Sequence, residues 1–250
     1  MSPLYLITGA SSGIGFAIAK ALLNSGASVI GLARTRSDKV QSLQNDYPER
    51  FIFEARDLTA DLDELPGWVL GLAKAHGRFS GCVHAAGVSQ ILPLSVNTQQ
   101  KMLEVFTLNV FAGLALARGI ADKRVYAESG ASIVFISSIA AKAGSSGLVN
   151  YSASKAALNG AMRAMAKEVA HLGIRVNSVL PGFVPTELAD KWPDVYNAAY
   201  IEKLERLYPL GLGEAEDVAE SVVFLLSEKA KWITGTELVV DGGISLGSQE

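Results

Sequence analysis

The chain has 250 residues, of which 49% are hydrophobic and 19% are charged, and its formal net charge is -3. This length and composition are typical of one globular domain, here residues 1–250, and argue against a disordered chain. The net charge is small, and the sequence contains no block of like charge, so we expect neither nucleic acid nor a membrane as partner.

Short apolar runs alternate with longer helical patterns along the whole chain. The predicted strands are residues 4–8, 28–33, 51–55, 81–84, 132–137, 175–180 and 237–240, and the predicted helices are residues 13–24, 37–45, 61–76, 98–128, 150–171 and 214–226. Strict alternation implies right-handed crossovers and a parallel sheet. We therefore predict an α/β fold, a doubly wound Rossmann fold whose seven-stranded parallel sheet is covered by helices on both faces and opens a ligand crevice at the carboxyl ends of the strands.

Residues 183–210 interrupt this alternation, because they are too many for a simple connection. The segment contains Trp192, Tyr196 and Tyr200. Its length and its aromatic residues predict a small lid over the crevice.

The N-terminus, MSPLYLITGA, lacks the basic region and cleavage site of a secretory signal. The longest apolar stretch, LNVFAGLALARGIA, is interrupted by Asn109 and Arg118 and is too short to span a bilayer. The single cysteine, Cys82, excludes an internal disulfide and is expected in the core. These features predict a cytoplasmic protein.

A glycine-rich turn, TGASSGIG, follows the first predicted strand and leads into the first helix, with glycines at Gly9, Gly13 and Gly15. Glycines at this place let backbone amides and a helix N-terminus approach the pyrophosphate of a dinucleotide. The alternative is a tight strand-to-helix turn without a ligand.

The second strand ends at the point where such a site reads the adenosine ribose. An acidic residue there would bind a free 2′-hydroxyl, but the chain has Ala33 followed by Arg34. A guanidinium suits a 2′-phosphate, so we predict that NADP(H) is preferred, with NAD(H) possible. The alternative is that Arg34 is a solvated loop residue.

Tyr151 and Lys155 lie four residues apart in the helical pattern YSASKAALNG. At 100° per residue their side chains leave the helix about 40° apart and can share one site. Lowering the pKa of a phenol from 10 to about 7 requires roughly 4 kcal/mol, which a nearby cation supplies only in a partly enclosed cleft. We predict that Lys155, helped by the charge of an oxidised nicotinamide, lowers the pKa of Tyr151.

Five motifs occur in the order and spacing of one family: TGASSGIG, HAAG, Asn109, Ser138 and YSASK. Together they make the chain resemble the short-chain dehydrogenase/reductase family from Leu4 to about Gly243, and the overall pattern resembles its 3-oxoacyl-[acyl-carrier-protein] reductase-like members. The resemblance implies an oxidoreductase that interconverts a carbonyl and a secondary alcohol by hydride transfer.

The same resemblance implies a role for each matching residue. Tyr151 exchanges the proton, Ser138 positions the substrate, Lys155 binds ribose and tunes the tyrosine, and Asn109 holds water in a proton relay. Ser137 competes with Ser138 for its role. The implied cofactor-binding residues are Gly9, Ser11, Ser12, Gly13, Ile14, Gly15, Arg34, Asp57, Leu58, Ala86, Gly87, Asn109, Tyr151, Lys155, Pro181, Gly182, Val184 and Thr186, and the implied substrate-binding residues are Ser89, Ser138, Tyr151 and Phe183.

The chain departs from the family pattern at some positions. HAAG replaces the frequent NNAG, so His84 is expected to be structural, and the three separated histidines show no metal-ligand spacing, so no metal site is predicted. Ser129 and Leu172 stand where carrier-protein reductases have basic docking residues, which weakens the carrier hypothesis. A small carbonyl compound, sugar or cyclic alcohol is the expected substrate.

Alternatives stay open at this point. A non-catalytic dinucleotide-binding regulator would keep the fold, and an epimerase or dehydratase would share the Tyr and Lys pair. By family analogy the chain is expected to form a homotetramer.

Overall fold

The computed structural model describes residues 2–189 and 192–247. Residues 1, 190–191 and 248–250 of the predicted domain and lid lie outside the described residues. Seven strands form one parallel sheet in the order β3-β2-β1-β4-β5-β6-β7, which confirms the predicted fold class. The strands are β1 (Leu4–Thr8), β2 (Ser28–Ala33), β3 (Phe51–Ala55), β4 (Gly81–His84), β5 (Ala131–Ile136), β6 (Ile174–Pro181) and β7 (Glu237–Val240).

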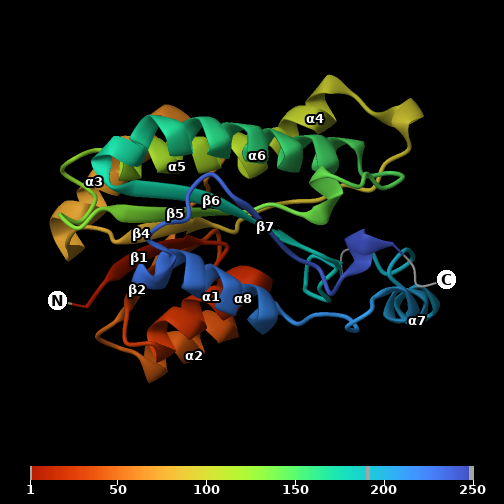
Figure 1. Cartoon of the computed structure of the whole chain (residues 1–250), viewed down its shortest axis with the longest axis horizontal. Coiled ribbons are helices and arrows are strands. Elements are labelled where there is room, and N and C mark those ends of the chain that lie inside the picture. Colours follow the sequence, from red (N-terminus) through yellow and green to blue (C-terminus); the bar gives the residue numbers. More distant parts are fainter. Residues whose placement is uncertain (1, 190–191, 248–250) are drawn as a thin grey trace.

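Helices cover both faces of this sheet (Figure 1). One face carries α3 (Leu65–His76), α4 (Gln99–Phe106), α5 (Gly113–Ile120) and α6 (Val149–Val169). The other face carries α1 (Gly13–Asn24), α2 (Asp38–Asp46) and α8 (Ala215–Leu226), while α7 (Ala198–Leu207) lies beyond the carboxyl ends of the strands. Parallel strands need such crossovers, which is why the sheet is buried on both sides.

Alternate residues of each strand feed two separate hydrophobic clusters. Leu6 and Phe135 belong to the cluster under α3, α5 and α6, whereas Ile7 and Val134 belong to the cluster under α1 and α8. Cys82 is buried in the first cluster, as predicted, and burial raises the pKa of its thiol to about 12. Burial on both faces explains why the strands read as continuous apolar runs.

The strand order reverses between β1 and β4, which pair in parallel with Thr8 opposite His84. Crossovers from β1 lead to one side of the sheet and those from β4 to the other. Connections diverge at such a point and leave a crevice above the carboxyl ends of the strands.

The predicted single helix over 98–128 is wrong in two respects. Its middle is a π-helical segment, Thr107–Ala112, between α4 and α5, and its end lies at Ile120. Residues 121–130 form turns, because the Asp122 carboxylate accepts the Arg124 amide and Gly130 adopts a positive φ of 95°.

The run from Gln99 to Ile120 is longer than the apolar stretch seen in the sequence. An 18-residue window within its 22 residues has a mean hydropathy of 1.4, which by length and composition is enough to cross a membrane, yet half of that window is buried within the fold. It packs on the sheet beside α3 and α6, in the same layer of helices, as a core helix does.

Smaller differences concern boundaries. β5 and β6 each begin one residue before the predicted positions, α2 begins after its N-cap Ser37, and α8 begins after Glu214. The helix predicted from Asp61 starts with the 3-10 turn Leu62–Glu64 because Asp61 has a left-handed φ of 47°. Helix α7, within the predicted lid, was not expected.

Candidate active site

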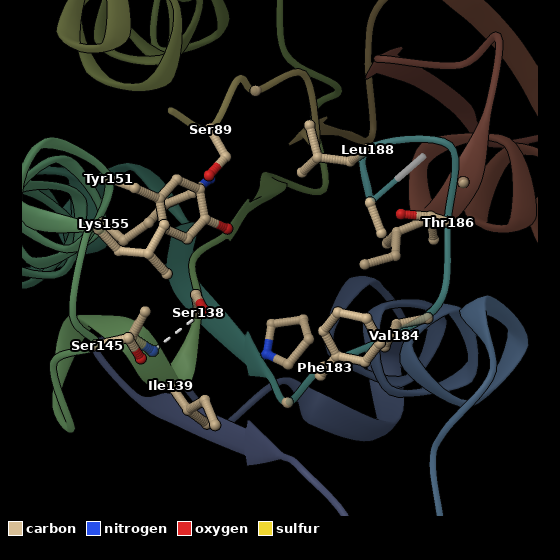
Figure 2. A pocket seen from close by; sticks show the side chains of 18 of the residues that line it. Ser89, Ser138, Ile139, Ser145, Tyr151, Lys155, Phe183, Val184, Thr186 and Leu188 are labelled. Atoms are coloured by element: carbon tan, nitrogen blue, oxygen red, sulfur yellow. Dashed lines mark hydrogen bonds between the residues drawn. The ribbon is translucent and has the colours of Figure 1, made fainter. Parts of the chain in front are cut away.

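A cavity of about 620 Å³ opens at the carboxyl edge of the sheet, between the glycine turn and residues 183–208. Figure 2 shows Tyr151, Lys155 and Ser138 on one side of it and Val184, Thr186 and Leu188 on the other. The predicted residues that line it are Gly9, Ser12, Gly13, Ile14, Gly15, Ala86, Gly87, Ser89, Ser138, Tyr151, Lys155, Pro181, Gly182, Phe183, Val184 and Thr186. Apart from Tyr151 and Lys155, these residues come from segments far apart in the sequence, and the fold brings them together at one edge of the sheet.

The glycine turn needs its glycines for close backbone approach. Gly9 has a φ of 71°, and a Cβ on Gly15 would lie 2.3 Å from the Gly9 carbonyl oxygen. The N-cap of α1, Ser12, makes no side-chain hydrogen bond to the helix amides. The first turn of α1 therefore offers amide donors and a positive dipole end to an anion, so the chain's own residues fit a dinucleotide's pyrophosphate.

Three predicted cofactor-binding residues, Arg34, Asp57 and Leu58, lie outside this cavity, at the ends of β2 and β3. Arg34 is exposed, directly after the last residue of β2. The Asp57 carboxylate accepts the amide and the hydroxyl of Thr59, and these bonds hold the pKa of Asp57 below its usual range. The Leu58 side chain is buried in the core, so only its backbone is available to a ligand.

Ser11 also lies outside the cavity and has a structural partner. Its carbonyl oxygen accepts the Ser37 hydroxyl at 2.8 Å, and the Ser37 oxygen also accepts the Val40 amide as the N-cap of α2. The start of α2 is thereby fixed against the glycine turn.

Tyr151 and Lys155 project from the first turns of α6 into the cavity, as their spacing predicts. Lys155 is 4% exposed, and its ammonium donates to the Ile136 carbonyl oxygen at 2.7 Å. The ammonium nitrogen lies 5.5 Å from the centroid of the Tyr151 ring. The two groups therefore share a sheltered site, with the cation over the ring face.

Burial dominates the acid–base properties of this pair. It raises the pKa of Tyr151 to about 12, while the Ser138 side chain acts in the opposite direction. Burial also lowers the pKa of Lys155 to about 8. The phenol is thus held in its protonated form by the protein alone, and the lowering of its pKa stays a prediction that depends on the charge of an oxidised nicotinamide.

Ser137 and Ser138 directly follow β5 but face different surroundings. The Ser137 side chain is buried and donates to the Lys155 carbonyl oxygen at 3.1 Å, whereas Ser138 lines the cavity. The Ser138 oxygen accepts the Ala140 amide at 3.1 Å, which leaves its hydroxyl proton free for another acceptor. The geometry favours Ser138 as the residue that contacts a substrate.

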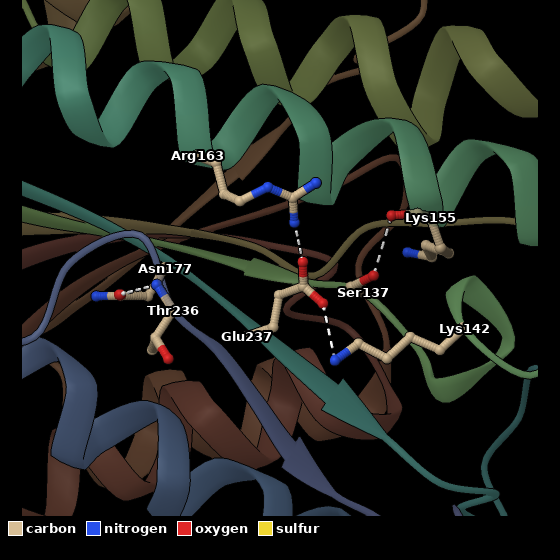
Figure 3. A network of polar contacts seen from close by, with 7 residues as sticks. All are labelled: Ser137, Lys142, Lys155, Arg163, Asn177, Thr236 and Glu237. Atoms are coloured by element: carbon tan, nitrogen blue, oxygen red, sulfur yellow. Dashed lines mark hydrogen bonds and ion pairs between the residues drawn. The ribbon is translucent and has the colours of Figure 1, made fainter.

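A partly buried carboxylate fixes the loop that carries Ser138 (Figure 3). Glu237 of β7 accepts Lys142, which follows that loop, at 3.0 Å, and also pairs with Arg163 of α6. Its side chain is 15% exposed. Because three elements meet at Glu237, the loop after β5 and helix α6 are held in register with the sheet.

Asn109 lies in the π-helical segment and is fully buried. Its side-chain oxygen accepts the Val88 amide at 2.8 Å, and its amide group donates to the Val88 carbonyl and to Ser154. These bonds fix the loop after β4 beside Gly87, where an added Cβ would lie 3.5 Å from the Lys155 ammonium. The side chain therefore positions the cavity wall, and its place in a water relay stays a prediction.

His84 is a structural residue, as its position at a strand end suggests. It is buried, with one ring nitrogen 3.1 Å from the Thr8 hydroxyl and the other 3.0 Å from the Leu108 carbonyl oxygen. Desolvation, with a smaller effect of Lys155, lowers its pKa to about 4. The neutral ring links β1, β4 and the π-helical segment.

Within residues 2–189 and 192–247, no group of three or more His, Cys, Asp and Glu could hold a metal ion.

The opposite wall follows β6. The Phe183 amide donates to the Tyr208 hydroxyl at 2.6 Å, and a Cβ on Gly182 would lie 2.9 Å from the Tyr208 ring. Thr186 lies against Gly13 of the glycine turn. This wall therefore reaches the N-terminus of α1.

Aromatic residues of the lid form a continuous surface in the cavity. The Phe183 and Tyr196 ring centroids are 5.2 Å apart, those of Tyr196 and Tyr200 are 5.6 Å apart, and Trp192 also lines the cavity. The length and the aromatic residues of this segment predict a lid, and that role stays a prediction.

Two charged residues of the site were missed. Glu187 lines the cavity, and its carboxylate pairs with Lys39 of α2. They are separated by 148 positions in the sequence, so no local spacing could have indicated their contact.

The chain is similar to known proteins over nearly its whole length. Residues 9–245 match the family model described as Enoyl-(Acyl carrier protein) reductase. A 3-oxoacyl-[acyl-carrier-protein] reductase of Rickettsia prowazekii is 37% identical over 240 residues, which cover 96% of this chain and 95% of that protein. A (3R)-3-hydroxyacyl-CoA dehydrogenase of Homo sapiens is 34% identical, over 97% of this chain and 95% of that protein.

A solved structure has the same fold over nearly the whole chain. A short-chain type dehydrogenase/reductase from Mycobacterium ulcerans has a TM-score of 0.88 and 33% identity, and the match covers 99% of this chain and 92% of that one. The motifs, the parallel sheet and these matches lead to one conclusion: the chain belongs to the short-chain dehydrogenase/reductase family and is an oxidoreductase.

Proposed function

We propose that the protein is an NADP(H)-dependent oxidoreductase that interconverts a small neutral carbonyl compound and its secondary alcohol. The observation that carries this proposal is the convergence of Ser138, Tyr151 and Lys155 on one cavity beside the glycine turn. When bound, the nicotinamide supplies or accepts the hydride at its C4 atom.

The side chains divide the remaining work. The Tyr151 phenol, protonated at neutral pH, donates its proton to the carbonyl oxygen of the substrate. The free hydroxyl proton of Ser138 hydrogen-bonds the same oxygen and orients it. The Lys155 ammonium binds the ribose and stabilises the phenolate that remains.

Arg34 supports a preference for NADP(H) over NAD(H). Within the described residues, no hydrogen bond or ion pair holds its side chain, whereas Arg36 lies 5.1 Å over the Phe53 ring and donates to Gln41. Arg34 is thus available for a 2′-phosphate. The last residue of β2 is Ala33 and not an acidic residue, so no carboxylate at that position would repel the phosphate.

We expect Arg34→Gln to weaken NADPH binding about tenfold and leave NADH binding nearly unchanged, because it removes one charge-assisted contact to the phosphate. Fluorescence titration of both reduced cofactors measures this, with Arg36→Gln as the matched control. A wild-type preference for NADH, or equal losses for both cofactors, would contradict the assignment.

The cavity favours an uncharged substrate. Lys155 and Glu187 are its only charged lining residues among those described, and the pair Tyr196 and Tyr200 presents aromatic rings. Since Lys155 is committed to the reaction, no cation remains for a phosphate or carboxylate of the substrate. Small ketones, sugars and cyclic alcohols fit these walls.

A 3-oxoacyl-carrier-protein reductase is the second candidate, favoured by the 37% identical relative. Docking of an acidic carrier needs basic residues, but Ser129 and Leu172 are exposed at the positions where the family resemblance expects them. NADPH oxidation with a panel of small neutral carbonyl compounds and with a 3-oxoacyl thioester separates the two. Turnover of the thioester alone would support the carrier-protein reductase and contradict our proposal. Absence of turnover with every carbonyl compound would support a non-catalytic regulator.

We also propose a cytoplasmic homotetramer, by the family resemblance. The outer face of α6 and the segment from Glu237 to Gly243 are the two surfaces that would pair with other copies.

A further inference from the structure

The carboxylate of Glu187 lies where an anion would meet the N-terminus of α1. Its Oε2 atom is 3.5 Å from the position that a Cβ on Gly13 would take, in the first turn of the helix. Its Oε1 atom is 2.5 Å from the Lys39 ammonium. Burial raises the pKa of Glu187, but contacts with Lys39 and with the Gly13 backbone outweigh it and leave that pKa below its usual value.

Lys39 also faces the same helix end. Its ammonium lies 5.5 Å from the centroid of the Phe16 ring, one turn into α1. The side chain comes from α2, whose start is tied to the glycine turn through Ser37 and Ser11. Any anion that replaces the Glu187 carboxylate at Gly13 would therefore meet the Lys39 ammonium at similar range.

A dinucleotide phosphate and the Glu187 carboxylate cannot share this place, because two anions at one helix end repel each other. Glu187 follows Thr186 on the cavity wall, near the start of the segment 183–210 that is predicted to form the lid. The ion pair is half exposed, with side-chain exposures of 52% for Lys39 and 43% for Glu187, and it can open without leaving a buried charge unpaired.

We propose that Glu187 occupies the position of a cofactor phosphate in the free protein, and that Lys39 exchanges Glu187 for that phosphate when the dinucleotide binds. Lys39 is then a cofactor-binding residue, and Glu187 is a built-in competitor of the cofactor phosphate. This inference rests on the dinucleotide binding proposed above.

The exchange predicts opposite effects for its two partners. At low ionic strength Glu187→Gln should lower the Kd for NADPH about threefold or more, because the competing anion is lost, while Lys39→Gln should raise it about threefold or more. Fluorescence titration of the purified full chain measures both. Lys20→Gln, which removes an equal charge from the exposed side of α1, is the control for general electrostatics.

Each other outcome overturns the inference. If the pair only holds the lid in place, loss of either partner releases the lid equally, and both variants shift the Kd in the same direction. If the contact is incidental, neither variant differs from Lys20→Gln. Wild-type protein that binds no NADPH would instead refute the proposed function, so the two failures are distinguishable.

Discussion

Tyr151→Phe should lower turnover by about a thousandfold while leaving the Kd for NADPH nearly unchanged. The substitution removes only the hydroxyl that donates the proton and keeps the ring that packs beside Lys155. The two other hydroxyls on this turn of α6, those of Ser152 and Ser154, do not line the cavity, and Ser154 is buried and donates to the Tyr151 carbonyl oxygen at 2.7 Å. Steady-state assays and cofactor titration measure the two quantities separately.

Tyr126→Phe is the matched control, since that tyrosine lies outside the cavity. It should leave turnover at the wild-type level. Normal turnover in Tyr151→Phe would refute the assignment of the proton donor, and equal loss in both variants would point to a general loss of folded protein.

Lys155→Met should lower turnover about a hundredfold or more and also weaken cofactor binding. Methionine keeps the length of the side chain but removes the charge that stabilises the phenolate and binds ribose. The loss of turnover should not be accompanied by a loss of stability. The Lys155 ammonium is buried, and burial lowers its pKa to about 8, so the charged form is costly to the folded protein. Methionine removes the cost of the desolvated charge but also loses the hydrogen bond to the Ile136 carbonyl oxygen, and because these two effects offset each other the Tm should stay close to the wild-type value.

Lys167→Met on the exposed face of the same helix is the control, and it should change neither turnover nor Tm. A lower Tm in Lys155→Met, together with the loss of turnover, would show that Lys155 serves the fold. The combination of lost activity and preserved Tm is the result that a catalytic role requires.

The sheet could be predicted from sequence because its central strands are buried on both faces, while the edge strands β3 and β7 are partly buried. Such strands are short apolar runs between polar turns, and β1 through β4 begin and end at the predicted residues. Helix ends were harder to place. The helix predicted through Glu128 stops at Ile120, where the Asp122 carboxylate captures the Arg124 amide, a local contact that apolar periodicity does not report.

The candidate site was predictable where its chemistry depends on local spacing. A spacing of four positions places Tyr151 and Lys155 on one side of α6. The glycines of the turn mark the places where backbone segments approach each other closely. Burial effects were not predictable: the spacing suggested an acidic phenol, but desolvation raises its pKa to about 12 in the protein alone. The contact between Lys39 and Glu187 depends on how the fold brings distant parts of the chain together, so the sequence around neither residue indicates it.

The pKa of Tyr151 itself is the most direct test of the central claim, that a sheltered phenol beside Lys155 transfers the proton. NMR titration of protein labelled at tyrosine Cζ, with Tyr151→Phe to assign the resonance, follows this group with and without NADP+. The phenol should stay protonated through the alkaline range in the free protein, in line with a pKa of about 12, and its pKa should fall by several units when NADP+ binds, since the added positive charge favours the phenolate. A pKa that NADP+ leaves unchanged would contradict the account.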